Sequence, residues 1–101
     1  MALDIHRTDT NEYIFGLDDK RQNNLAIIFE QFEKRNGRRI DLYGDTVIDT
    51  GNIKLLIQLI DEYIQKTDLN KSKNQTSIVL EFKGLLNIFL EKRIALKFLG
   101  D

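Results

Sequence analysis

Three stretches of this chain repeat apolar residues at the spacing of an α-helix, and this periodicity constrains the fold more than any other feature. The apolar residues of the first stretch follow the i, i+3, i+4, i+7 pattern of one buried helical face: Leu25, Ile28, Phe29 and Phe32. Asp18 or Asp19 can cap its N-terminus, and Gly37 is a good stop because it tolerates the left-handed conformation. The pattern predicts a helix over 19–36.

The second stretch begins near Thr50 or Asn52, either of which can serve as the N-cap. Its apolar stripe consists of Ile53, Leu56, Ile57, Ile60 and Ile64. The polar residues 67–75 that follow predict a solvated loop between two halves of the chain.

The third stretch predicts a helix that begins at Thr76 or Ser77 and runs to about Leu99. One face of it carries Ile78, Phe82, Leu85, Leu86, Phe89 and Leu96. A second apolar group lies on nearly the opposite side: Leu80, Leu90, Ile94 and Phe98. So wide an apolar surface implies burial on two sides, within the domain or in a homodimer. As an alternative, residues 78–82 are β-branched enough to form a strand that ends at Gly84.

Short strands are expected in two other places. Residues 2–7 and 13–17 could form two short strands joined by the polar turn 8–12, because Leu3 and Ile5 alternate with polar neighbours as a half-buried strand requires. Residues 39–43 predict a further extended segment, followed by a turn at Gly44 and Asp45. The sequence therefore predicts one domain, residues 1–101, that is mainly α with three amphipathic helices and a small N-terminal β-hairpin; an α+β fold is the alternative.

The chain has few residues of the types that usually act in catalysis or metal binding. The chain has no cysteine, proline or tryptophan, and His6 is its single histidine. Most general-base, nucleophilic and metal chemistry relies on histidine or cysteine, so we expect neither an enzyme nor a metal or cofactor site. The N-terminus lacks the pattern of a secretory signal, and no apolar run is long enough to span a bilayer, which predicts a cytoplasmic protein.

Charge alternates in blocks along the chain, although the net charge is only −1. Residues 1–19 and 40–70 are each net −4, whereas residues 20–39 and 71–100 are each net +4. Adjacent blocks can attract one another across the fold, with little energy for each pair. Alternatively, one block faces a charged partner and steers its approach.

Two blocks contain compact clusters. The basic cluster is Lys34, Arg35, Arg38 and Arg39, which suits phosphate but is flanked by Glu30 and Glu33. The acidic loop 40–49 combines three carboxylates, an aromatic and a glycine turn, which suits a basic partner. With two acids of the second helix, it gives the predicted partner-binding set: Asp41, Tyr43, Asp45, Asp49, Asp61 and Glu62. The loop could equally be an ordinary polar connection with Tyr43 in the core.

Several of these segments resemble a known family. The residues that carry the resemblance are Phe15-Gly16-Leu17-Asp18, the helix through Phe29 and Phe32, and Ile40-Asp41-Leu42-Tyr43-Gly44-Asp45-Thr46. Over about residues 13–65 the chain resembles immunity proteins of bacterial polymorphic toxins, in particular those of contact-dependent growth inhibition systems. The resemblance implies a non-enzymatic inhibitor that binds one toxin domain and occludes its active site.

Two other classes of function remain open on the sequence. A small nucleic-acid-associated regulator would use the basic cluster, and its binding would depend steeply on salt. A structural or adaptor protein would self-assemble through Leu80, Leu90, Ile94 and Phe98, which a measurement of molar mass in solution would reveal.

Overall fold

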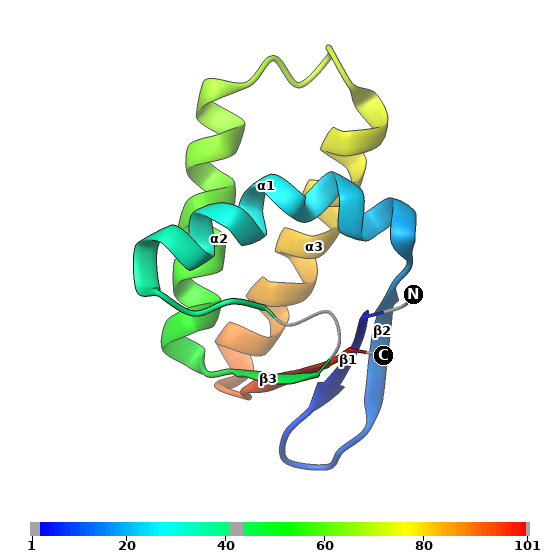
Figure 1. Cartoon of the computed structure of the whole chain (residues 1–101), viewed down its shortest axis with the longest axis vertical. Coiled ribbons are helices and arrows are strands. Elements are labelled where there is room, and N and C mark those ends of the chain that lie inside the picture. The colour runs from blue at the N-terminus through cyan, green and yellow to red at the C-terminus, as the bar shows by residue number, and fades with distance from the viewer. Residues whose placement is uncertain (1–2, 41–43, 101) are drawn as a thin grey trace.

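Three helices pack against one face of a four-stranded antiparallel sheet in the computed structural model, which describes residues 3–40 and 44–100 (Figure 1). In chain order the elements are β1 (Leu3–Arg7), β2 (Tyr13–Leu17), α1 (Asp19–Asn36), β3 (Asp45–Ile48), α2 (Thr50–Lys66), α3 (Lys73–Lys92) and β4 (Leu96–Leu99). The fold is therefore α+β, the alternative that the sequence left open. The N-terminal hairpin is confirmed, but it is half of a larger sheet.

The strand order in the sheet is β2-β1-β4-β3, with every neighbouring pair antiparallel. The last strand, β4, lies between β1 and β3, so it joins the N-terminal hairpin to the middle of the chain. Strands β1, β3 and β4 alternate buried and more exposed residues; in β4, Leu96 and Phe98 are buried, whereas Lys97 and Leu99 are only partly so. This alternation places one face of the sheet against the helices.

Helix α1 has the bounds that its sequence predicts. The Asp18 carboxylate accepts the backbone N–H of Arg21 at 2.9 Å and so satisfies one of the free amides at the N-terminus. At the other end, Gly37 is left-handed with φ of 73°, and its N–H donates to Glu33 O at 2.8 Å. Leu25, Ile28 and Phe32 are buried, while Phe29 is only partly buried.

Helix α2 begins at Thr50, but neither Thr50 nor Asn52 is its cap. Asp49 is the cap, because its carboxylate accepts the Asn52 N–H at 2.8 Å. Of the predicted stripe, Ile53, Leu56 and Ile60 are buried, whereas Ile57 and Ile64 are partly buried; Leu59 is the fourth buried position.

Helix α3 differs from its prediction at both ends. It begins at Lys73, inside the predicted loop, and ends at Lys92, so the expected continuation to Leu99 is wrong. The chain leaves the helix at Arg93, which adopts a left-handed conformation with φ of 56°. The following residues form β4, because apolar Leu96 and Phe98 alternate with polar or exposed neighbours and so fit a half-buried strand. The strand alternative for residues 78–82 is also wrong, since they are helical.

The early end of α3 removes the second apolar face that the longer helix would have had. Phe98 is fully buried on β4, with its ring edge-on to Phe82, whereas Leu80 on α3 is 46% exposed. Leu90 and Ile94 are partly buried against the core. These four residues therefore do not form one surface, and a homodimer, which stays a prediction, would need a different one.

The segment before α2 is also rearranged. The predicted strand at 39–43 is wrong at Arg39 and Ile40, which are not in a strand, and residues 41–43 lie outside the described residues. The strand comes later, as β3, in which Asp45 is the first residue rather than part of a turn. Thr46 and Ile48 are buried while Asp45 and Val47 are exposed, which is the two-residue period of a half-buried strand.

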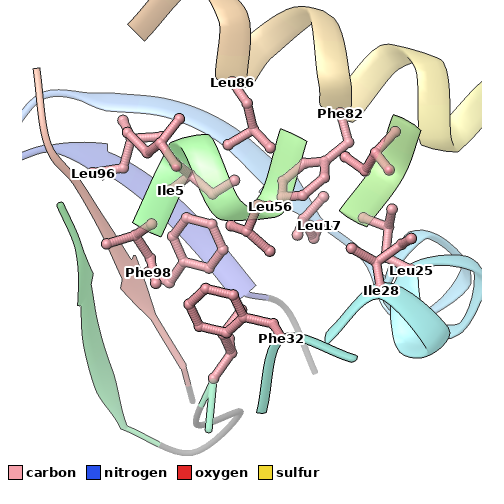
Figure 2. Close-up of a cluster of buried hydrophobic side chains, with 14 of the residues drawn as sticks. Ile5, Leu17, Leu25, Ile28, Phe32, Leu56, Phe82, Leu86, Leu96 and Phe98 are labelled. Atoms are coloured by element: carbon pink, nitrogen blue, oxygen red, sulfur yellow. The ribbon is translucent and has the colours of Figure 1, made fainter. Parts of the chain in front are cut away.

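The core lies between the helices and the inner face of the sheet (Figure 2). Side chains from α1, α2, α3 and the strands converge there; those labelled in Figure 2 are Ile5, Leu17, Leu25, Ile28, Phe32, Leu56, Phe82, Leu86, Leu96 and Phe98. The rings of Phe29, Phe82 and Phe98 follow one another edge to face, with centroids 6.0 and 6.3 Å apart.

We predict that Phe32→Ala lowers the free energy of unfolding by about 3–5 kcal/mol, because Phe32 is fully buried and its removal leaves a cavity. Urea denaturation followed by circular dichroism measures this. The matched control is Ile88→Ala on α3, where half of the side chain is exposed, and we expect a change within about 0.5 kcal/mol. Equal losses in the two variants would contradict the core assignment.

A second stability prediction concerns Arg93. A non-glycine residue at positive φ destabilises the folded state by about 1–2 kcal/mol, and glycine removes this cost. Glycine also raises the conformational entropy of the unfolded chain, which offsets part of the stability gained. Arg93→Gly should therefore raise the free energy of unfolding by about 0.5 kcal/mol, whereas the β-branched Arg93→Val should lower it. Thermal melts of both variants test the sign, and a less stable Arg93→Gly would contradict the left-handed cap.

Candidate protein-binding surface

The residues that the sequence assigned to a partner lie at separate places in the fold. Asp41 and Tyr43 fall outside the described residues. Asp45 is exposed at the start of β3, and Asp49 caps α2. Asp61 is 12 residues after Asp49 on the same helix, which places it about 18 Å away along the axis. The structure therefore does not bring the described members of the set together.

Asp61 and Glu62 are both engaged in contacts between helices. The Lys83 ammonium of α3 pairs with Asp61. On the neighbouring side of α2, the Arg35 guanidinium of α1 donates to both carboxylate oxygens of Glu62, at 2.9 and 3.3 Å. All four side chains are partly exposed, so each pair contributes little to stability. Their charges are nevertheless balanced within the molecule and offer less to a partner.

The basic cluster is also divided. Arg35 is paired with Glu62, and the Arg38 guanidinium donates to the Val47 carbonyl of β3 at 2.9 Å. Lys34 and Arg39 are exposed. Two of the four cations therefore hold elements of the fold together, which weakens the case for a phosphate-binding patch.

The outer face of the sheet, away from the helices, brings together side chains that the sequence analysis had not grouped (Figure 1). The strand register places them in two rows across the sheet. From β2 to β3, the first row is Gly16, Asp4, Leu99 and Asp45, and the second is Tyr13, His6, Lys97 and Val47. We call these eight residues the outer face.

Two apolar side chains of the outer face are unusually open to solvent. Tyr13 is 58% exposed and Val47 is 46% exposed, at opposite edges of the second row. In the first row, Asp4 and Asp45 are on either side of Leu99, about 10 Å apart because two strand spacings separate them. Among the described residues neither carboxylate has an ion-pair partner. The outer face thus combines apolar contact area with two carboxylates and one ammonium group, that of Lys97, and its charged side chains sum to −1.

Contacts near the hairpin turn hold His6 and Tyr13 in place. The Nδ1 of His6 is 3.1 Å from the Asn11 carbonyl oxygen, which can only accept, so Nδ1 carries the proton and Nε2 of the neutral ring is an acceptor. The His6 and Tyr13 rings meet edge to face with centroids 5.6 Å apart. Asp4 and His6 share the outer side of β1, but the described contacts of the His6 ring are with Asn11 and Tyr13.

The turn itself is fixed by an ion pair between Arg7 and Asp9. Arg7 Nε and a terminal nitrogen donate to the two Asp9 oxygens at 3.0 and 2.8 Å. These hydrogen bonds hold the pKa of the Asp9 carboxyl below its usual range and raise the pKa of Arg7. Because the pair is open to solvent, its main effect is on the geometry of the turn.

Within residues 3–40 and 44–100, no group of three or more His, Cys, Asp or Glu side chains could hold a metal ion. Nor does any helix of those ranges have the length and apolar character needed to cross a membrane. Comparison of the chain with protein-family models, curated proteins and solved structures found no match.

Sequence reasoning found one member of the outer face, Asp45, and missed the grouping of the rest. The alternation around Leu3 and Ile5 did indicate which residues of the first strand face the core, but residues 13–17 do not alternate and gave no such signal. Lys97 and Leu99 were assigned to a helix, however, and without β4 nothing connects Asp4 to Asp45.

Gly16 allows a test of how Tyr13 lies. A Cβ added at Gly16 would be 2.7 Å from the Tyr13 hydroxyl oxygen and 3.4 Å from an Asp4 carboxylate oxygen. Because the hydroxyl is the far end of a rotatable side chain, Gly16→Ala should displace the Tyr13 ring and leave the sheet intact.

We expect Gly16→Ala to shift the NMR signals of the His6 ring protons, which lie against the Tyr13 ring, by as much as Tyr13→Ala shifts them. The control is Gly84→Ala on α3, where the added Cβ meets nothing within 4 Å, so the His6 signals should not change. Unchanged His6 signals in Gly16→Ala would contradict the position of Tyr13.

Proposed function

We propose that this chain is a non-enzymatic immunity protein that binds and neutralises a cognate bacterial toxin domain in the cytoplasm. The observation that carries the proposal is the outer face, where exposed Tyr13 and Val47 accompany the two carboxylates Asp4 and Asp45. The family resemblance of residues 13–65 supplies the class of partner.

The outer face has the ingredients of a protein interface. Tyrosine is enriched among residues that dominate binding energy, because its ring provides contact area and its hydroxyl a hydrogen bond. Tyr13 is held by His6, so little side-chain freedom would be lost when a partner covers it. Asp41 and Tyr43 lie outside the described residues, and their role in partner binding stays a prediction from the sequence.

The charge of this surface favours one kind of toxin. The active-site groove of a nuclease is basic because it binds phosphates, and carboxylates can take the place of that phosphate charge. Asp4 and Asp45 would enter such a groove, and the bulk of the sheet would then block access of nucleic acid. Asp61 and Glu62, already paired with Lys83 and Arg35, would contribute less.

The alternative of a nucleic-acid-associated regulator has weaker support. Arg35 and Arg38 of the basic cluster make intramolecular contacts, and both carboxylates of the outer face would repel phosphate. Self-assembly as an adaptor has no defined surface once Phe98 is buried.

The proposal is tested with the cognate partner, identified by pull-down from the source bacterium or from the adjacent gene, by measuring binding rates and protection of cells that express the toxin. Asp4→Asn combined with Asp45→Asn should slow association several-fold at low salt, and the difference should fade as salt is added. Tyr13→Ala should speed dissociation by about 30-fold, which corresponds to the loss of about 2 kcal/mol expected for a residue that dominates binding.

The matched control is Glu30→Gln, which removes an exposed carboxylate of α1 outside the outer face and should leave both rates unchanged. The proposal fails if the outer-face variants bind and protect like the unmodified chain. If a variant lacking Lys34, Arg35, Arg38 and Arg39 alone loses protection, the partner contacts the basic cluster instead.

A further inference from the structure

A groove runs between α1 and α2, in the helical layer and away from the outer face. Its volume is about 280 Å³. Ile28 and Leu59 form a buried apolar floor, and Ile27 and Tyr63 line it from the two helices. Ile27 is 44% exposed, one of few large apolar side chains left open in the described part of the chain. The groove therefore exposes apolar surface that nothing in the fold covers.

The charges of the groove are arranged unevenly. Arg35 and Glu62 pair across it, so one carboxylate and one guanidinium are already balanced. Lys66 lies one helical turn beyond Glu62 on α2, and within the described residues no ion pair engages it. The groove thus offers one unmatched positive charge about one turn from Tyr63.

The open shape of the groove favours a polypeptide over a small cofactor. Pockets for drug-sized ligands usually enclose most of the ligand, whereas this groove is open at the surface. Tyr63 and Thr67 also line a second hollow of about 390 Å³ that includes Lys71 and Asp68. The two hollows share these two residues and so adjoin on α2; we call them together the cleft.

The cleft as a whole is lined by more basic than acidic residues. The basic residues are Arg35, Lys66 and Lys71, and the acidic residues are Glu62 and Asp68. The Asp68 carboxylate already accepts the Asn70 N–H at 3.0 Å. A bound segment would need a large apolar side chain for the floor and a carboxylate for Lys66. Tyr63 and Lys66 are one turn apart on α2. If the bound segment is a helix, an apolar residue and a carboxylate one turn apart on one of its faces have the same spacing.

We propose that this cleft docks an acidic amphipathic helix of a second partner protein, with its apolar stripe over Ile27 and Tyr63 and its carboxylates toward Lys66 and Lys71. This is a common mode of helix recognition, in which apolar anchors enter a groove and rim charges set orientation. Because the cleft and the outer face lie on different layers of the fold, the two partners would bind together without competing.

The test uses three synthetic fluorescein-labelled 14-residue helical peptides: one with a leucine stripe and glutamates, one with lysines in place of the glutamates, and one with serines in place of the leucines. Fluorescence anisotropy should show binding of the first peptide only. Ile27→Glu should weaken that binding at least 10-fold, because it places a charge in the apolar groove, and Lys66→Gln should weaken it about 3-fold at low salt.

The matched control is Leu80→Glu, since Leu80 is 46% exposed on α3 and does not line the cleft. It should bind the acidic peptide like the unmodified chain, and thermal melts confirm that both Glu variants fold. Equal binding by Ile27→Glu, tighter binding of the lysine peptide, or no binding of the acidic peptide at 1 mM would each overturn the proposal. None of these outcomes bears on the outer face, because Tyr13 is intact in all variants.

Discussion

The pairing of β4 with both β1 and β3 is the interaction on which the rest of the structure depends. The N-terminal hairpin is two strands, and an isolated hairpin is marginally stable in water. β3 is four residues long and has no other described strand partner than β4. By lying between the hairpin and β3, β4 joins them into one four-stranded sheet and gives the helices a surface to cover. Phe98 then projects from β4 to the Phe82 ring of α3.

The sequence predicts those elements whose signals are local. For α1, the cap at Asp18, the apolar spacing and the stop at Gly37 agree with one another, and the helix has the expected bounds. At the end of α3 the signals conflict, because Leu96 and Phe98 can continue either a helical stripe or a two-residue alternation. Pairing with β1 and β3 decides for the strand, and a pairing that spans about 90 residues leaves no trace in a local window.

The candidate surface also depends on long-range strand pairing that a local stretch of sequence does not reveal. Asp45 could be singled out because charge, an aromatic and a glycine stand close together in sequence. Its neighbours across the outer face, Asp4 and Leu99, come from opposite ends of the chain and meet only through the register of β1, β4 and β3. Conversely, Asp61 and Glu62 appeared to be available charges, but helix packing brings cations to both. Which charges are free depends on tertiary structure.

The central position of β4 also determines when the protein can fold during its synthesis. Domains generally begin to fold as they emerge from the ribosome, yet here β1 and β3 must wait until residues 96–99 have been made before they have a common neighbour. Until then the emerging chain presents Phe82 and the inner sides of β1 and β3 to solvent, together with unpaired strand edges. Such a chain is exposed to aggregation throughout its elongation. We therefore expect ribosome-bound chains that lack β4 to engage chaperones and to be cut readily by proteases, and the complete chain to resist both.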